Sequence, residues 1–179
     1  MQTEEPHIVK SHDIHIDTDY ANWIAEVKHR YRSAQVKAAV KVNAEKLLFN
    51  WQLGRDLVQK KAEERWGAGV VEQVSLDLKR EFPDAEGFSA RNLRYMKQWY
   101  LFYTIEAENR QRSVAELDEA IKDEEFPLPF SLVPWGQHIE IITRCKKLEE
   151  ALFYIQQVIE KGLSRPALIN CIKANLYEH

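Results

Sequence analysis

The stretch VKAAVKVNAEKLLFNWQLGRDLV, residues 36–58, decides the fold class of this chain. Its apolar and small residues recur every three or four positions, which places them on one face of an α-helix. The residues of this stripe are Val36, Val40, Asn43, Leu47, Trp51, Gly54 and Val58. A glycine inside a helix costs about 1 kcal/mol relative to alanine. We therefore interpret Gly54 as a point where another helix crosses closely.

A further helical stripe precedes this one and ends before Ser33; it consists of Trp23, Ile24, Val27 and Tyr31. The chain has 179 residues, of which 45% are hydrophobic and only six are glycine and six proline. These are too few turn-forming residues for an all-β domain or a low-complexity disordered chain. The sequence predicts an all-α domain with one long N-terminal helix.

The middle of the chain predicts two helices joined by a short turn. The first carries an apolar stripe and ends before Pro83, because proline cannot continue a helix; its members are Val70, Val71, Val74, Leu78 and Phe82. Residues 84–88 form the turn, for which Gly87 supplies backbone freedom, and Ser89 has the chemistry of an N-cap. In the helix that follows, the predicted core face consists of Leu93, Met96, Tyr100 and Tyr103.

This layout is that of a helix-turn-helix unit, whose second helix enters the major groove of DNA. The opposite face of that helix carries Arg91, Arg94, Tyr95 and Gln98. Arg91 and Arg94 suit phosphates and base edges, Gln98 a bidentate amide contact, and Tyr95 a phosphate hydroxyl contact. The alternative is a purely structural pair of helices, with Arg91 and Arg94 bound to acidic residues such as Asp77 or Glu81.

Overall charge restricts any contact with nucleic acid. There are 25 lysines and arginines against 28 aspartates and glutamates, so the formal net charge is −3. Bulk positive charge therefore cannot hold the chain on DNA, and a local patch is needed. A second basic run lies on the long helix, where we select Lys37 and Lys41, with Lys46 beyond them; its alternative reading is a solvated face.

The composition predicts four parts along the chain. Residues 1–19 read as a flexible acidic arm, and residues 20–112 as a helical lobe containing the helix-turn-helix. Residues 113–133 are acidic and proline-rich and read as a mobile connection. Residues 134–179 read as a second lobe of three helices, in which Gly162 ends one helix and Ser164 caps the next.

The sequence contains no catalytic pattern that we recognise. No glycine is followed by lysine as in a phosphate-binding loop, and neither a Gly-x-Ser-x-Gly elbow nor a His-Glu-x-x-His pair occurs. Pro83 and Asp84 begin a PD-(D/E)-x-K pattern, but no Lys after Asp84 has an acidic residue two positions before it. We expect no enzymatic activity, no cofactor and no metal site in this chain.

We interpret the two cysteines, His138 and four tryptophans as structural residues. Cys145 and Cys171 lie among apolar residues and read as small core side chains, and His138 reads as a hydrogen-bonded structural residue. The tryptophans near core stripes read as packing residues; they are Trp51, Trp66, Trp99 and Trp135. The N-terminus has no apolar signal segment and no membrane-spanning run is present, so a cytoplasmic protein is expected.

Several stretches together resemble the YhcG-type N-terminal domain, a domain of unknown function that precedes a PD-(D/E)-x-K nuclease domain in bacterial proteins. The resemblance covers most of residues 22–177 and is carried by 49–54 (FNWQLG), 66–71 (WGAGVV), 74–78 (VSLDL) with 82–83 (FP), and 87–93 (GFSARNL) with Met96. In the second lobe, Gln137 and Leu163 stand where the family pattern has histidine and tryptophan. The resemblance implies a winged-helix-like or helix-turn-helix DNA-binding module.

The first hypothesis is a non-catalytic DNA-recognition domain of a bacterial nuclease. The resemblance implies that cleavage belongs to a C-terminal domain absent from this chain, so the expected partners are DNA and that nuclease domain. The alternative is a protein interaction module, or one that forms a homodimer, without nucleic-acid contact. Its basis is the negative net charge and an apolar stripe longer than one lobe can cover. No membrane partner is expected.

Overall fold

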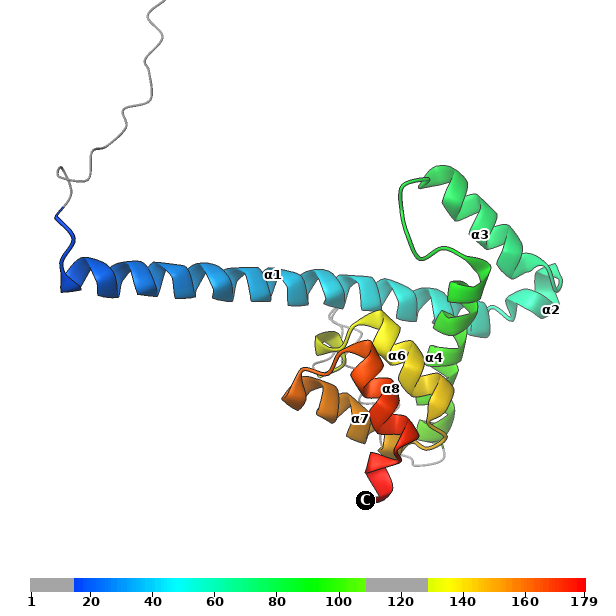
Figure 1. Cartoon of the computed structure of the whole chain (residues 1–179). Helices are drawn as coiled ribbons and strands as arrows, with labels where there is room; N and C mark the ends of the chain where they lie inside the picture. The colour runs from blue at the N-terminus through cyan, green and yellow to red at the C-terminus, as the bar shows by residue number, and fades with distance from the viewer. Residues whose placement is uncertain (1–14, 109–128) are drawn as a thin grey trace, which may run out of the picture. The chain divides into compact units, whose positions relative to one another are not determined.

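The computed structural model describes residues 15–108 and 129–179 (Figure 1). These residues form seven α-helices and two short 3-10 helices and contain no strand. The all-α prediction is therefore confirmed, whereas its winged-helix detail is not. The helices are α1 (Thr18–Gln59), α2 (Ala62–Trp66), α3 (Val70–Glu81), α4 (Ala90–Glu108), α6 (Trp135–Arg144), α7 (Leu148–Lys161) and α8 (Arg165–Lys173), with the 3-10 helices η2 (Phe130–Leu132) and η3 (Leu176–Glu178).

Helix α1 is one continuous helix where the sequence predicted two helical stretches. It begins after Asp17, whose carboxylate accepts a hydrogen bond from the Tyr20 amide at 3.0 Å. The chain divides into two compact units, Met1–Ala39 and Val40–His179, so the first part of α1 belongs to one unit and the rest to the other. Most of the predicted acidic arm, residues 1–14, lies outside the described residues.

Several apolar residues predicted to lie in buried stripes are exposed instead, among them Trp23, Tyr31 and Phe82. Val36 is 63% exposed, so the buried stripe of α1 starts further along the helix than predicted. Trp66 is 56% exposed, and the Arg65 guanidinium lies over its ring at 5.0 Å. The burial predicted for these residues was wrong because periodicity shows which face of a helix is apolar but not how far along the helix a neighbour covers it.

Helices α1 and α4 meet in the core of the second unit. The rings of Trp51 and Trp99 lie edge to face with centroids 5.2 Å apart, and Trp99 makes a similar contact with Trp135 at 4.9 Å. Gly54 lies against the backbone of α4: a Cβ there would come within 2.7 Å of the Met96 carbonyl carbon. The prediction that Gly54 permits a close helix crossing is confirmed.

The predicted connection of residues 113–133 falls mainly outside the described residues, which resume at residue 129. Its last residues pack into the second unit, where Val133 is fully buried. The Asn43 side-chain amide donates to the carbonyls of Ser131 and Val133 at 2.8 and 3.1 Å. This polar member of the α1 stripe therefore anchors the segment before α6.

Among the last three helices, the predicted helix end at Gly162 and the predicted N-cap at Ser164 are confirmed, whereas α8 ends at Lys173. Gly162 ends α7 with a φ of 58°, and the Ser164 hydroxyl accepts the Ala167 amide at 3.3 Å to begin α8. Cys145 is buried and Cys171 is half-buried, and both are free thiols. Burial raises the pKa of the Cys145 thiol to about 12. No described helix combines the length and apolar character that crossing a membrane requires.

Candidate nucleic-acid interface

Helix α4 buries the face that the sequence assigned to the core. Leu93, Met96, Tyr100 and Tyr103 are between 0% and 7% exposed. Val70 and Val74 of α3 are partly buried against the same core. Helices α3 and α4 are in direct contact (Figure 1), whereas the helix-turn-helix assignment of the pair stays a prediction. The outward face of α4 is available for contacts.

The turn between α3 and α4 is held by side-chain hydrogen bonds from both helices. The Ser75 hydroxyl donates to the Phe88 carbonyl at 2.5 Å, and the Asn92 amide donates to the Gly87 carbonyl at 2.6 Å. Gly87 has a φ of 93°, a conformation that a Cβ penalises. The Ser89 hydroxyl accepts the Asn92 backbone amide at 3.1 Å, which confirms Ser89 as the N-cap of α4.

Asn92 also connects the turn to the second predicted lobe. Its side-chain oxygen accepts a hydrogen bond from the Trp135 indole nitrogen at 2.8 Å. One side chain therefore sets the start of α4, the turn before it and the position of α6. Sequence reasoning quoted Asn92 only as part of a pattern and assigned it no role. The sequence did offer one signal for this role: Asn92 lies three residues after the Ser89 cap, in the first turn of the helix.

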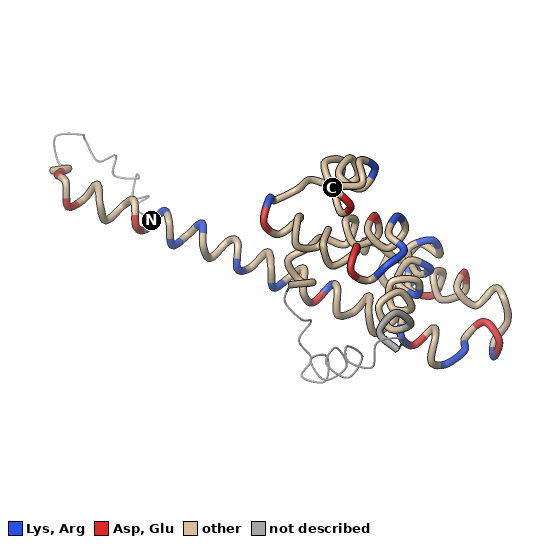
Figure 2. Tube along the Cα trace, turned by 90° about the horizontal axis from the view of Figure 1, so that it is seen from below, with Lys and Arg blue, Asp and Glu red and all other residues tan. Residues whose placement is uncertain are grey.

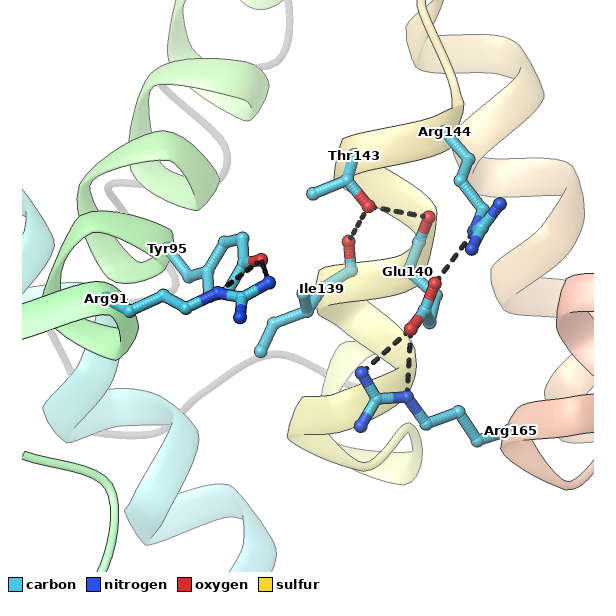
Figure 3. Close-up of polar contacts among 7 residues, drawn as sticks. All are labelled: Arg91, Tyr95, Ile139, Glu140, Thr143, Arg144 and Arg165. Atoms are coloured by element: carbon cyan, nitrogen blue, oxygen red, sulfur yellow. Dashed lines mark hydrogen bonds and ion pairs between the residues drawn. The ribbon is translucent and has the colours of Figure 1, made fainter. Parts of the chain in front are cut away.

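Arg91 and Tyr95 form a pair on the outward face of α4. The Arg91 guanidinium donates to the Tyr95 hydroxyl from two nitrogens, at 3.2 and 3.1 Å, and lies 5.6 Å from the ring centroid. Figure 3 shows both side chains pointing toward α6, where Ile139 faces them. Arg91 is exposed and has no carboxylate partner within the described part of the chain. Its charge is therefore not neutralised there.

Arg94 is engaged differently. Its guanidinium binds the carboxylate of Glu72 on α3, with both side chains about half exposed. The hydrogen bond from Arg94 holds the pKa of Glu72 below its usual value. The partner is neither of the two acidic residues considered from the sequence. Of those, Asp77 accepts a hydrogen bond from Gln73 at 2.9 Å.

The other polar residues of α4 complete this face. Lys97 binds the carboxylate of Glu63 on α2 at 2.9 Å, so a second cation of α4 is paired within the unit. Gln98 is exposed. Arg91 and Gln98 are exposed on one side of α4, Tyr95 between them is partly buried against the core, and Arg94 lies beside them in its ion pair. These four residues make up what we call the α4 face.

The lysines selected on α1 stand apart from that face. Lys41 and Lys46 are exposed in the second unit, and no hydrogen bond or ion pair among the described residues joins them to the α4 side chains. Lys37 belongs to the first unit, where its side chain is exposed.

A second cationic cluster, which sequence reasoning missed, surrounds Glu140 of α6. Arg144 binds one carboxylate oxygen at 2.8 Å, and Arg165 of α8 binds the other at 2.7 Å. Burial acts to raise the pKa of Glu140, but the hydrogen bonds from the two arginines outweigh it and the pKa lies below its usual value. Figure 3 shows this cluster on the side of α6 that faces away from Arg91. It connects helices rather than extending the α4 face.

The neighbours of this cluster explain why two short sequence patterns occur together. Gly136 lies under Arg165, because a Cβ there would approach a guanidinium nitrogen to 3.2 Å. Gln137 donates to the Leu163 carbonyl at 2.6 Å. The stretches 135–138 and 163–165 therefore hold α6 and α8 together. Within the described residues, no group of three or more histidine, cysteine, aspartate or glutamate side chains is placed to hold a metal ion.

Comparison with known proteins confirms the predicted resemblance. The family model described as the DUF1016 N-terminal domain matches residues 26–179. The chain is similar to the Escherichia coli (strain K12) protein named "Putative nuclease YhcG", with 25% identity over 171 residues. That match covers 84% of this chain but only 44% of the length of the relative. No solved structure matches the chain significantly.

Proposed function

Because this chain belongs to the DUF1016 N-terminal domain family, we propose that it is a DNA-recognition domain with no catalytic site of its own. The observation that carries the proposal is the α4 face. It presents a guanidinium without a carboxylate partner among the described residues, a phenol and an amide, on a helix that follows a short, firmly held turn. Such a helix fits the major groove, where its first turns reach phosphates and base edges.

Each residue of the α4 face has a role in the proposed complex. Arg91 is held by Tyr95 and needs little reorganisation to reach a phosphate or a guanine edge. Gln98, two turns further along α4, offers an amide to an adenine edge or a phosphate. Arg94 exchanges Glu72 for a phosphate, since an exposed ion pair is weak and easily replaced.

The proposal also has an electrostatic requirement, because the net charge of the chain is −3. Binding therefore depends on local cations, which in this proposal are those of the α4 face and the exposed Lys41 of α1 in the same unit. A few phosphate contacts make affinity fall steeply as the salt concentration rises. The whole chain should therefore bind duplex DNA at low salt and release it as salt is added.

The decisive variant is Arg91→Ala, with affinity for duplex DNA measured by fluorescence anisotropy over a range of salt. If Arg91 makes a bidentate base contact, the variant loses about 1 to 3 kcal/mol of binding free energy. The matched control is Lys147→Ala, which removes an equal charge from an exposed position between α6 and α7. No binding by the wild-type chain at low salt, or equal losses in both variants, contradicts the α4 face.

A second variant separates the two arginines. Glu72→Gln removes the carboxylate that binds Arg94 while keeping a side chain of the same size. It releases the guanidinium and removes one negative charge beside α4, so we expect tighter binding to DNA. In an Arg94→Ala background the same Glu72→Gln change should have a smaller effect. Identical effects in both backgrounds would show that Arg94 takes no part.

The absence of catalysis is part of the proposal. The name of the relative refers to nuclease activity, and the chain spans less than half of that protein. We propose that cleavage resides in a C-terminal nuclease domain of the parent protein, which this domain directs to DNA. Incubation with plasmid and single-stranded DNA in Mg²⁺ or Mn²⁺ should leave both intact, and cleavage that survives repurification would overturn this part.

A further inference from the structure

The part of α1 in the first unit, residues 18–39, carries an apolar seam that packs against no other described element of that unit, although Ile24 and Val27 are half-buried. The seam consists of Tyr20, Ile24, Val27, Tyr31, Ala34 and Ala38, at alternating steps of four and three residues. This is the repeat of a coiled-coil core. Tyr20 is 39% and Tyr31 66% exposed, and Trp23 beside the seam is 54% exposed. The seam therefore lacks the second helix that such a repeat specifies.

Packing among the described residues of its own unit contributes little to the stability of this segment. The described part of the first unit is this helix alone. A single helix of this length is marginal in water, because most helical stability in proteins comes from packing an apolar face. Proteins also rarely leave a contiguous apolar surface in contact with water. A helix that packs along the seam would supply what the segment lacks.

The charge pattern of this segment indicates which helix can pair with it and in which direction that helix runs. Residues 15–27 carry Asp17, Asp19 and Glu26 without a lysine or arginine. Residues 28–39 reverse this pattern, with Lys28, Arg30, Arg32 and Lys37 and no acidic residue. Figure 2 shows this change from red to blue along the helix. Two copies side by side in the same direction place like charges together, whereas opposite directions place each acidic half beside a basic half.

Side-chain size agrees with the opposite direction. In an antiparallel pair of this seam, Tyr20 of one copy meets Ala38 of the other, Ile24 meets Ala34, and Val27 meets Tyr31. Each contact joins a larger side chain to a smaller one, which keeps the two helices evenly spaced. In a parallel pair Tyr31 meets Tyr31 and Ala38 meets Ala38, so the spacing is uneven. Arg30, near the centre of the antiparallel pair, is held by Glu26 of its own helix at 3.8 Å.

We propose that residues 18–39 pair with the same segment of a second copy of this chain as an antiparallel two-helix coiled coil. The pairing buries the seam of both copies and matches their charges. It does not depend on the proposed contact with DNA, which uses residues of α4.

The first test is the oligomeric state of the whole chain by sedimentation equilibrium over a wide concentration range. We expect a reversible dimer. Val27→Glu places a charge in the seam and should weaken dimerisation by about tenfold or more. The control is Val36→Glu, an equal change on the opposite side of the same helix, where the valine is 63% exposed. Its dimer should match the wild type.

The second test determines direction by disulfide formation in a Cys171→Ala background, in which Cys145 remains buried. A chain with Ile24→Cys is mixed with a chain with Ala34→Cys and oxidised. The antiparallel pair predicts a disulfide between the two different chains. It places the two copies of residue 24 roughly 15 Å apart, too far for a bond. The parallel pair predicts disulfides within each kind of chain.

Three outcomes overturn the proposal. These are a wild-type chain that stays monomeric at all concentrations, equal weakening by Val27→Glu and Val36→Glu, and disulfides that form mainly within one kind of chain. Circular dichroism and thermal unfolding of the second unit check that each variant keeps its fold. Because no DNA is present, a negative result here leaves the proposed recognition role unaffected.

Discussion

Gly54 of α1 lies directly against the backbone carbonyl of Met96 on α4, with no side-chain atom between the two helices. The close crossing brings Trp51 of α1 onto Trp99 of α4 and sets the inclination of the helix that carries the α4 face. Gly54 of α1 therefore helps to set the orientation of the helix that carries the α4 face.

The first prediction concerns this crossing. Gly54→Ala adds a Cβ that would come within 2.7 Å of the Met96 carbonyl carbon, so the helices must separate. We expect a loss of about 1 to 3 kcal/mol in the free energy of unfolding, typical of overpacking, although alanine favours the helix. Urea denaturation measures it. Gly69→Ala, where a Cβ meets open space, is the control and should change stability little.

The second prediction concerns Asn92 and Trp135. Asn92→Ala leaves the buried Trp135 indole N–H without an acceptor and should cost about 1 to 3 kcal/mol. A double-mutant cycle with Trp135→Phe should show a coupling of about 1 kcal/mol, because the second change removes the stranded donor. Additive effects of the two substitutions would show that this hydrogen bond contributes nothing to stability. Gln156→Ala, at an exposed amide bonded to Glu160, serves as the comparison.

The third prediction concerns pH. His138 is fully buried and its Nε2–H donates to the Phe130 carbonyl at 2.9 Å. Burial lowers the pKa of His138 from 6.5 to about 4, although hydrogen bonds to backbone carbonyls partly oppose this. The unfolded chain therefore binds a proton on this histidine between pH 6.5 and 4, and the folded chain does not. The stability linked to His138 is complete above pH 6.5 and decreases as the pH falls toward 4, by on the order of 3 kcal/mol.

His138→Gln tests this dependence because glutamine keeps a donor near the position of Nε2 and does not titrate. The free energy of unfolding of the variant should change much less between pH 7 and pH 4.5 than that of the wild type. Two pH profiles that run parallel over this range would contradict the assignment, whatever the stability of the variant at pH 7.

The fourth prediction compares two buried tyrosines of α4. The Tyr103 hydroxyl is buried and has no hydrogen-bond partner within the described part of the chain, and burial raises the pKa of Tyr103 above its usual value. Tyr103→Phe removes a dehydrated polar group and should leave stability unchanged or raise it by about 1 kcal/mol. The Tyr100 hydroxyl accepts a hydrogen bond from Gln59 at 3.3 Å, so Tyr100→Phe should lower stability. In thermal denaturation, the midpoint should fall for Tyr100→Phe and stay the same or rise for Tyr103→Phe.

Features that depend on a few neighbouring residues were predictable. The caps Ser89 and Ser164 and the turn glycines Gly87 and Gly162 lie where expected. The close crossing at Gly54 was also expected. Each follows from the hydrogen-bonding needs of a helix end or from the space that a Cβ occupies. The assignment of Arg91, Arg94, Tyr95 and Gln98 to one outward face followed from the helical period, whereas their contact with DNA stays a prediction.

The partners of those residues were not predictable. Arg94 binds Glu72, and Trp135 binds Asn92 across 43 residues of chain. The exposure of Trp66 and Val36 was not predictable either. Whether another helix covers these side chains depends on the tertiary structure.

The amino-acid sequence by itself determined that the chain forms helices, where most of them begin and end, and which side of each is apolar. Hydrogen bonds and side-chain periodicity within one or two turns are sufficient for these properties. Only the tertiary structure decided which apolar faces are covered and which charges are neutralised. Those outcomes depend on contacts between residues far apart in the chain, whose positions follow from how the helices pack. Arg91 and Arg94 therefore look equivalent in the sequence, yet Arg94 is bound to Glu72 whereas Arg91 contacts Tyr95 and has no carboxylate partner among the described residues.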